Sequence, residues 1–124
     1  MDAPVASDSH VLRESLIDLG IDGWRFARLF GRVLSKLDAG EGSRFASQHR
    51  YYLKRLEESL QAAGMRIVSI EGQPYDPGIA ASALNLGEFG PDDSLVVEHM
   101  VEPIIMGPDG LLRAGTVTLR KVGE

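Results

Sequence analysis

The sequence predicts an α+β protein, in which an N-terminal helical hairpin is followed by a small all-β domain. Apolar residues recur at helical spacing through the first half of the chain, and at the alternating spacing of strands through the second half. Gly64, a residue type that often ends helices, marks the change. We therefore expect a helical dimerisation region at residues 1–64 and a small β domain at residues 65–124.

Three helices are expected in the first half, over residues 9–19, 24–38 and 43–63. In the first, Leu12, Leu16 and Leu19 share one face, with an N-cap at residues 7–9. The segment "GIDG" at 20–23 is expected to interrupt the helical pattern, and "AGEG" at 39–42 to connect the second helix to the third. Ser43 would cap the third helix.

The second and third helices are expected to lie antiparallel, because the connection between them is short. Apolar stripes lie on more than one side of this hairpin, which favours packing against a second copy as a dimeric four-helix bundle. The alternative is that both stripes pack on the chain's own sheet. The residues expected at the dimer interface are Phe26, Phe30, Val33, Leu37, Leu53, Leu56 and Leu60.

The second half predicts short strands. "RIVSIE" alternates, "SLVVEHMVEPIIM" is rich in β-branched residues but interrupted by Pro103, and "GPDG" at 107–110 is a turn. In "TVTLRKV", Val117, Leu119 and Lys121 share one face. These short strands indicate a small twisted β module.

Composition excludes several classes of function. The chain has no cysteine, which rules out disulfides, thiol nucleophiles and thiolate metal sites. The net charge of −5 arises after Met65, where four basic residues face nine acidic ones, so nucleic acid is not an expected partner. No apolar run approaches the roughly 20 residues of a membrane span, and no secretory signal opens the chain. We expect a cytoplasmic protein with no membrane partner.

The densest polar cluster is Glu98, His99 and Glu102, and on a regular strand the histidine points away from both carboxylates. The three could hold a metal only if the strand were bulged. Asp92 and Asp93 follow Gly-Pro and indicate a turn with local Asx hydrogen bonding. We therefore expect no catalytic residue, no metal, no cofactor and no enzymatic activity. A small metal-dependent enzyme using the three residues is an alternative.

A resemblance appears in the order of the motifs. After the hairpin and Gly64 come a strand, then Pro74, Tyr75, Asp76 and Pro77, and finally "LLRAGTVTLRKV" with Arg113 near its start. This arrangement, over roughly residues 26–122, resembles GrpE, the nucleotide exchange factor of DnaK-type heat-shock chaperones. In that family, a helix ends in glycine, a Pro-aromatic-Asp-Pro motif follows a short strand, and the chain closes with an aliphatic-Arg pair before a Val-x-Val strand.

The resemblance implies a homodimer whose β domain binds the ATPase domain of a DnaK-type chaperone, opens its nucleotide cleft and releases ADP. It implies partner contacts at Met100, Arg113 and the strand from Val117 to Leu119. From the residues alone, Met100 and Val117 fit a core equally well, and Arg113 fits a structural bridge between strands. The motif at 74–77 is expected to be a hinge that sets the angle between the helical dimer and the β domain.

The chain also departs from the family pattern. Ala80 stands where the family has a histidine, Pro103 and Ile104 replace a Gly-Tyr pair, and Gly110 stands near an expected arginine. The long N-terminal stalk helix is shrunk to residues 9–19. Gly110 and the pair Pro103 and Ile104 favour the alternative function, a dimeric interaction module on a GrpE-like scaffold that binds a chaperone or other partner without nucleotide exchange.

Overall fold

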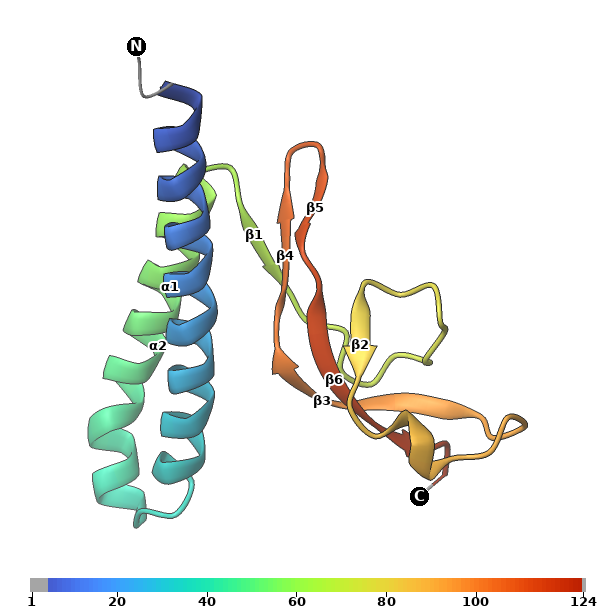
Figure 1. Cartoon of the computed structure of the whole chain (residues 1–124). Helices are drawn as coiled ribbons and strands as arrows, with labels where there is room; N and C mark the ends of the chain where they lie inside the picture. The colour runs from blue at the N-terminus through green and yellow to red at the C-terminus, as the bar shows by residue number, and fades with distance from the viewer. Residues whose placement is uncertain (1–4, 124) are drawn as a thin grey trace. The chain divides into compact units, whose positions relative to one another are not determined.

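The computed structural model describes residues 5–123 and has the expected α+β order, two helices followed by six short strands (Figure 1). The chain forms two compact units that meet between Ala63 and Gly64, one residue before the predicted boundary. The elements are α1 (Val5–Leu34), α2 (Ala39–Ala62), β1 (Arg66–Val68), β2 (Ala81–Ala83), the 3-10 helix η1 (Leu86–Glu88), β3 (Leu95–Glu102), β4 (Ile104–Gly107), β5 (Gly110–Arg113) and β6 (Gly115–Lys121).

The first two predicted helices are one continuous helix, α1, so the expected break at 20–23 is wrong. The reason is tight packing against α2. A β-carbon at Gly20 would lie 3.0 Å from a methyl carbon of Leu60, and one at Gly23 would lie 2.6 Å from the hydroxyl of Tyr52. Glycine costs about 1 kcal/mol relative to alanine inside a helix. Close approach of the two helices at these positions offsets that cost.

The connection between the helices has the predicted length of four residues but lies four residues earlier, at 35–38 instead of 39–42. α1 ends at Leu34, and α2 begins at Ala39, not at Ser43. Asp38 is the N-cap: its Oδ1 accepts a hydrogen bond of 2.9 Å from the backbone N–H of Glu41. An acidic cap with a glutamate three residues later is a helix-start pattern that the sequence already contained. At the other end, Gly64 has φ +77°, which confirms it as the residue that ends the helix.

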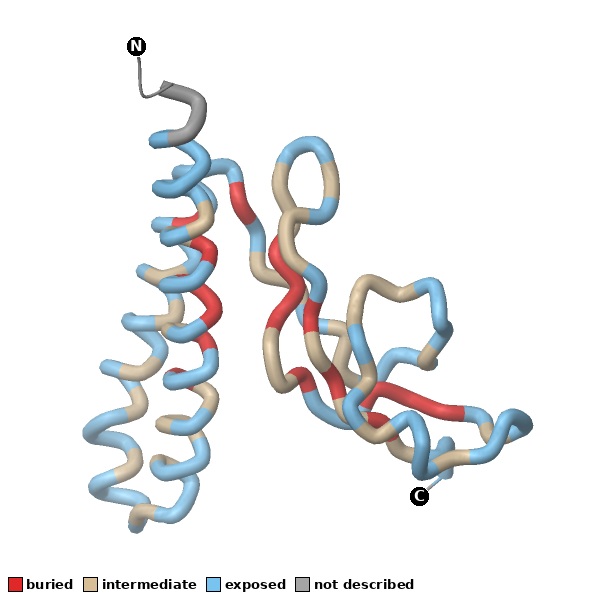
Figure 2. Tube along the Cα trace, viewed as in Figure 1, coloured by how far each residue is buried: buried red, intermediate tan, exposed pale blue. Residues whose placement is uncertain are grey.

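A histidine joins the helices near the middle of the hairpin. His49 of α2 places Nε2 2.8 Å from the carbonyl oxygen of Ala27, to which it donates as the Nε2–H tautomer. Its ring lies 5.9 Å from that of Phe30, and a β-carbon at Gly31 would meet it at 3.4 Å. The buried apolar positions of α1 recur at helical spacing (Figure 2). The buried apolar residues of the helical unit are Ile17, Ile21, Trp24, Ala27 and Leu60.

The β unit is built on one long, bent, two-stranded ribbon. A single residue, Pro103, separates β3 from β4, and a single residue, Ala114, separates β5 from β6. β3 pairs with β6, and β4 with β5, both antiparallel. The ribbon therefore passes from one sheet to the other at these two residues. β1 extends one sheet in the order β1-β4-β5, and β2, parallel to β6, extends the other in the order β2-β6-β3.

Several strand predictions are confirmed. Pro103 interrupts the long apolar segment, residues 107–110 form the turn between β4 and β5, and Val117 and Leu119 face inward while Lys121 is exposed. β2, whose small residues carry little strand signal, was not predicted. The buried apolar residues of the β unit are Met65, Leu95, Val96, Val97, Met100, Pro103, Ile104, Ile105, Val117 and Leu119.

Candidate functional site

The segment at 72–75 lies against β3 as an additional, irregular edge of the sheet. The N–H of Gly72 donates to Val97 O, the N–H of Val97 donates to Gln73 O, and the N–H of Tyr75 donates to Leu95 O, each at 2.9 Å. An isolated bridge also joins Pro74 to β3. Because proline has no N–H, it fits this edge position without leaving a donor unpaired.

Asp76 and Pro77 then form a tight turn. The Oδ1 of Asp76 accepts from the N–H of Gly78 at 2.7 Å, and its carbonyl oxygen accepts from the N–H of Ile79 at 2.9 Å. Pro77 takes the second position of the turn, where its fixed φ is favourable. This confirms the turn but not the hinge. The motif at 74–77 lies within the β unit, and the change from helical to β unit occurs at Gly64.

The carboxylate of Glu71, next to this segment, accepts a hydrogen bond from the backbone of β3. Strand β3 has register shifts between Val97 and His99 and between Met100 and Glu102. Between them, the backbone N–H of Met100 donates to Oε2 of Glu71 at 2.8 Å. A side chain thus bonds a strand amide in an irregular part of the sheet. Glu71 was missed by the sequence reasoning, since its partner is 29 residues away.

Three of the four expected partner contacts are in the core. Met100, Val117 and Leu119 are 3%, 0% and 2% exposed, so the expectation that they form a binding surface is corrected by their burial. They pack inside the unit because the inward face of β6 is opposite the inward residues of β3. Arg113 is half-buried at the end of β5, which is an edge strand of its sheet. Leu111 of the same strand is exposed. The register of β4 and β5 shifts between the two residues, so that Arg113 is opposite Ile105 and Leu111 is opposite Met106, the next residue of β4. They therefore do not share one regular strand face.

The structure describes the local environment of the positions at which the sequence differs from the motif pattern that it resembles. Gly110 has φ +127°, a conformation that L side chains rarely adopt, so an arginine there would be strained. Pro103 and Ile104 are buried at the bend of the ribbon. Ala80 uses its backbone: its carbonyl oxygen accepts from the N–H of Gly115 at 3.0 Å.

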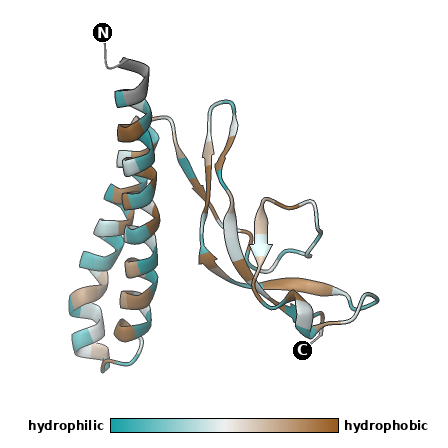
Figure 3. Ribbon diagram, viewed as in Figure 1, coloured by the Kyte–Doolittle hydropathy of each residue, from teal (hydrophilic) through white to brown (hydrophobic). Residues whose placement is uncertain are grey.

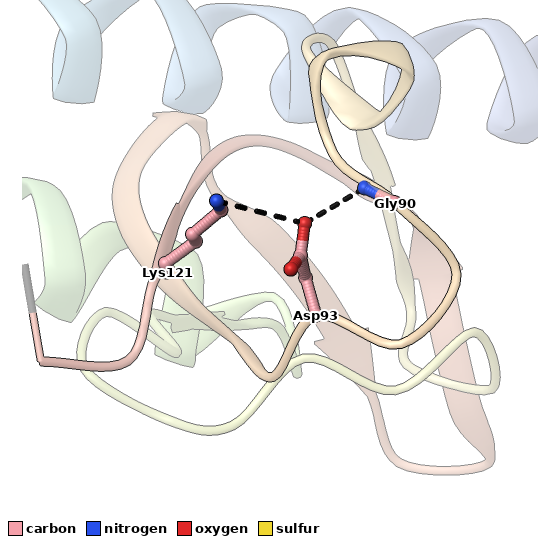
Figure 4. A network of polar contacts seen from close by, with 3 residues as sticks. All are labelled: Gly90, Asp93 and Lys121. Carbon is pink, nitrogen blue, oxygen red and sulfur yellow. Dashed lines mark hydrogen bonds and ion pairs between the residues drawn. The ribbon is translucent and has the colours of Figure 1, made fainter.

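Two further side chains hold the loops of this unit. Asn85 pairs with Leu119 through both ends of its amide: Nδ2 donates to the carbonyl oxygen at 2.9 Å, and Oδ1 accepts from the N–H at 2.8 Å. Asp93 accepts from the N–H of Gly90 at 2.7 Å, and its Oδ2 lies 3.9 Å from Nζ of Lys121 (Figure 4). The predicted turn is confirmed, since the N–H of Asp93 donates to the carbonyl oxygen of Gly90 at 3.2 Å. The side-chain bond runs back to Gly90, three residues earlier, and not two residues forward as in an Asx turn. The pair with Lys121 is exposed and contributes little to stability.

The strand carrying Glu98, His99 and Glu102 is irregular, as a shared metal site would require. Even so, Glu98 and His99 are exposed, whereas Glu102 is half-buried and accepts a hydrogen bond of 2.8 Å from the hydroxyl of Thr116. Within the described part of the chain, no group of three or more His, Cys, Asp or Glu side chains is placed to hold a metal ion.

The expected dimer-interface residues are in different environments within the helical unit. Phe26 and Val33 are 63% and 47% exposed. Leu60 is 1% exposed and packs on Gly20 within the hairpin, so its assignment to a dimer interface is wrong. The other four, Phe30, Leu37, Leu53 and Leu56, are half-buried.

No helix in the described residues combines the length and apolar character that a membrane span needs. In comparisons with known proteins, no family model matches this chain. No curated protein and no solved structure matches it either.

Proposed function

We propose that this protein is a GrpE-like nucleotide exchange factor, which acts in the cytoplasm as a homodimer and binds the ATPase domain of a DnaK-type chaperone through its β unit. One observation carries the proposal. A helical hairpin, a terminating Gly64, the Pro-Tyr-Asp-Pro turn and a bent β ribbon follow one another in the order that the resemblance implies. The factor would bind without making or breaking a bond.

Exchange requires only differential binding. If the β unit binds the ATPase domain more tightly when its nucleotide cleft is open than when ADP holds it closed, it lowers the affinity of that domain for ADP. The factor by which this affinity falls equals the factor by which ADP weakens binding of the β unit. A difference of about 1.4 kcal/mol corresponds to tenfold weaker ADP binding. A β unit held by the turn at Asp76, the Asn85 amide and the strand pairing is suited to this, because little ordering would be needed on binding.

The contact surface we propose differs from the sequence-based expectation. Since Met100, Val117 and Leu119 are buried, the accessible counterpart we propose is the edge strand β5, with the exposed Leu111 and the half-buried Arg113. Arginine is enriched in protein–protein contacts, and an exposed leucine contributes apolar area to such a contact.

The test is the rate at which fluorescent ADP leaves the cognate ATPase domain with wild type, Leu111→Asp and Leu84→Asp. Leu84 is also an exposed leucine of the β unit but lies just after β2, so its variant is the matched control. We expect Leu111→Asp to lose most of the acceleration and Leu84→Asp to retain it. Equal activity of both variants would remove β5 from the proposal.

A second candidate function is binding to a chaperone or other partner without nucleotide exchange. The observation that favours it is Gly110, because a glycine stands beside the tip of the β4–β5 hairpin near the position where the family has an arginine. This candidate predicts a complex with the ATPase domain but an unchanged rate of ADP release.

A further inference from the structure

Strand β2 is the outermost strand of the sheet β2-β6-β3 and pairs with β6, in parallel, along one of its two edges (Figure 1). Two hydrogen bonds flank this pairing. The carbonyl oxygen of Ala80 accepts from the N–H of Gly115 at 3.0 Å, and the N–H of Leu84 donates to the carbonyl oxygen of Val117 at 2.9 Å. These bonds show which backbone groups of the segment point toward β6.

The backbone groups of Ala81 and Ala83 point away from β6. Residues 80 and 84 bond to β6, and the backbone groups of successive residues alternate between the two edges of a strand. Ser82 therefore faces β6, whereas the two alanines face the other edge, which we call the free edge of β2. Among residues 5–123, no group is hydrogen-bonded to the N–H or the carbonyl oxygen of either alanine. Unpaired groups of this kind are a template for a further strand.

The free edge of β2 lacks residues that commonly protect edge strands. The segment "IAASAL" at 79–84 has no charged residue and no proline, whereas protected edges often carry lysine or proline. β2 is pale in Figure 3, because alanine and serine are neither strongly apolar nor strongly polar. Ser82 is exposed, and Leu84 is 65% exposed. The short strand thus offers a backbone edge that its own small side chains do not obstruct.

The charge of the chain around β2 is negative. Between Arg66 and Arg113 the sequence has no lysine or arginine and has eight aspartates and glutamates. The loops that enter and leave β2 carry three exposed acidic residues, Asp76, Glu88 and Asp92. A negative field attracts a basic partner and speeds its association at low salt. It also disfavours pairing of the free edges of two copies of this chain, because their acidic loops repel one another.

We propose that the free edge of β2 binds an extended basic peptide segment of another protein, which adds to the sheet as a further strand. In a segment of alternating apolar and basic residues, the apolar side chains lie beside Ala81 and Ala83 and continue the inward face that includes Val117. The basic side chains lie beside Ser82 and toward the acidic loops. The inference goes beyond the proposed function, because β5, the proposed chaperone contact, belongs to the other sheet.

The probe is a short synthetic peptide of alternating arginine and valine, titrated into the isotope-labelled protein, and the control peptide has glutamate in place of arginine. We expect the arginine peptide to bind at least about tenfold more tightly than the glutamate peptide at low salt, with a smaller ratio at high salt. Binding should slow amide exchange at Ala81 and Ala83 more than at Ser82, whose N–H already faces β6. Equal affinities of the two peptides, or protection at another strand edge, would overturn the proposal.

N-methylation of the peptide distinguishes strand addition from charge attraction alone. Alternate amides of an added strand face β2, and the amides between them face solvent. Methylating the set that faces β2 removes its hydrogen-bond donors. Of two peptides methylated at the two alternate sets, one should therefore bind at least about tenfold more weakly, while the other keeps the affinity of the parent peptide. The same affinity for both methylated peptides would contradict strand addition.

Variants of β2 test the same edge from the side of the protein. Ala83→Pro removes an N–H that faces away from β6, so it should weaken peptide binding at least about tenfold without the loss of a bond to β6. Gly87→Ala is the control and should bind as wild type does, since a β-carbon there meets nothing within 4 Å. Wild-type affinity in a folded Ala83→Pro variant would overturn the proposal.

A second pair of variants replaces Ala83→Pro if thermal unfolding shows that it does not fold. The exposed Ser82 is changed to lysine or glutamate, and Ser82→Lys should bind the arginine peptide about fivefold more weakly than Ser82→Glu. Equal binding by this pair would remove the charge argument and overturn the proposal. A wild-type dimer that the peptide dissociates would mean that a second copy occupies the free edge, which would also overturn it.

Discussion

Gly115 lies against the backbone of Glu102: a β-carbon at position 115 would be 2.9 Å from the Glu102 carbonyl oxygen. It would also lie 3.0 Å from Met100 Cε and from a side-chain carbon of Ile104. The next residue, Thr116, donates its hydroxyl hydrogen to the carboxylate of Glu102. The chain is thus tightly packed at Gly115, where the ribbon passes from one sheet to the other.

Gly115→Ala is therefore expected to destabilise the β unit by about 1–3 kcal/mol, because the clash is with backbone as well as side chains. The measurement is urea unfolding followed by amide exchange of the β unit. Gly87→Ala is the matched control, since a β-carbon there would meet nothing within 4 Å. Equal stability of the two variants would mean that the ribbon is not closely packed at Gly115.

Asn85→Ala is expected to lower the free energy of unfolding of the β unit by about 1–3 kcal/mol, because it leaves the N–H and carbonyl oxygen of Leu119 without their side-chain partner. Asn85→Asp is the informative companion. It retains an acceptor for the N–H but brings a carboxylate to the carbonyl oxygen, so it should be destabilised as well. Wild-type thermal stability in both variants would contradict the role of the amide.

Asp38→Ala should destabilise the helical unit by about 1 kcal/mol through loss of the cap on α2, whereas Asp38→Ser should keep most of the stability. Trp24 is the only tryptophan of the chain, so its fluorescence during unfolding reports the helical unit. Indistinguishable midpoints for Asp38→Ala and wild type would show that another residue starts α2.

Much of the strand half was predictable because its signals are local. Pro103 breaks the strand within its own segment, residues 107–110 form their own turn, and Gly64 ends the helix that precedes it. The N-cap at Asp38 also had a local signal, which the prediction passed over in favour of Ser43.

The rest depended on residues distant in sequence. Gly20 and Gly23 predicted a break in the helix because the free-energy cost of glycine in a helix depends only on the residue itself. The compensating contacts with Leu60 and Tyr52 come from another helix. Asn85 and its partner are 34 residues apart, and nothing near an asparagine in sequence reveals such a bond. Burial of Met100 and Val117 depends on which strand faces which, so the sequence left the choice between core and contact open.

The hairpin tip offers a test of the missing arginine. Gly110→Arg is expected to destabilise the β4–β5 hairpin, by roughly 1 kcal/mol or more, because of the φ of +127° at this position. Asp109→Arg places the same charge beside it at an exposed position. If the chaperone contact is electrostatic, Asp109→Arg should increase ADP release without loss of thermal stability. An unchanged rate with full stability would place the tip outside the contact, and a lower rate would contradict an electrostatic contact that favours a positive charge at the tip.

The central proposal is tested most directly by stopped-flow release of fluorescent ADP from the cognate DnaK-type ATPase domain, with and without the wild-type protein. We predict an acceleration of at least about tenfold at saturating protein, with a saturation curve that gives the affinity of the complex. An unchanged release rate, with no complex detected at micromolar concentrations, would contradict the assignment as an exchange factor.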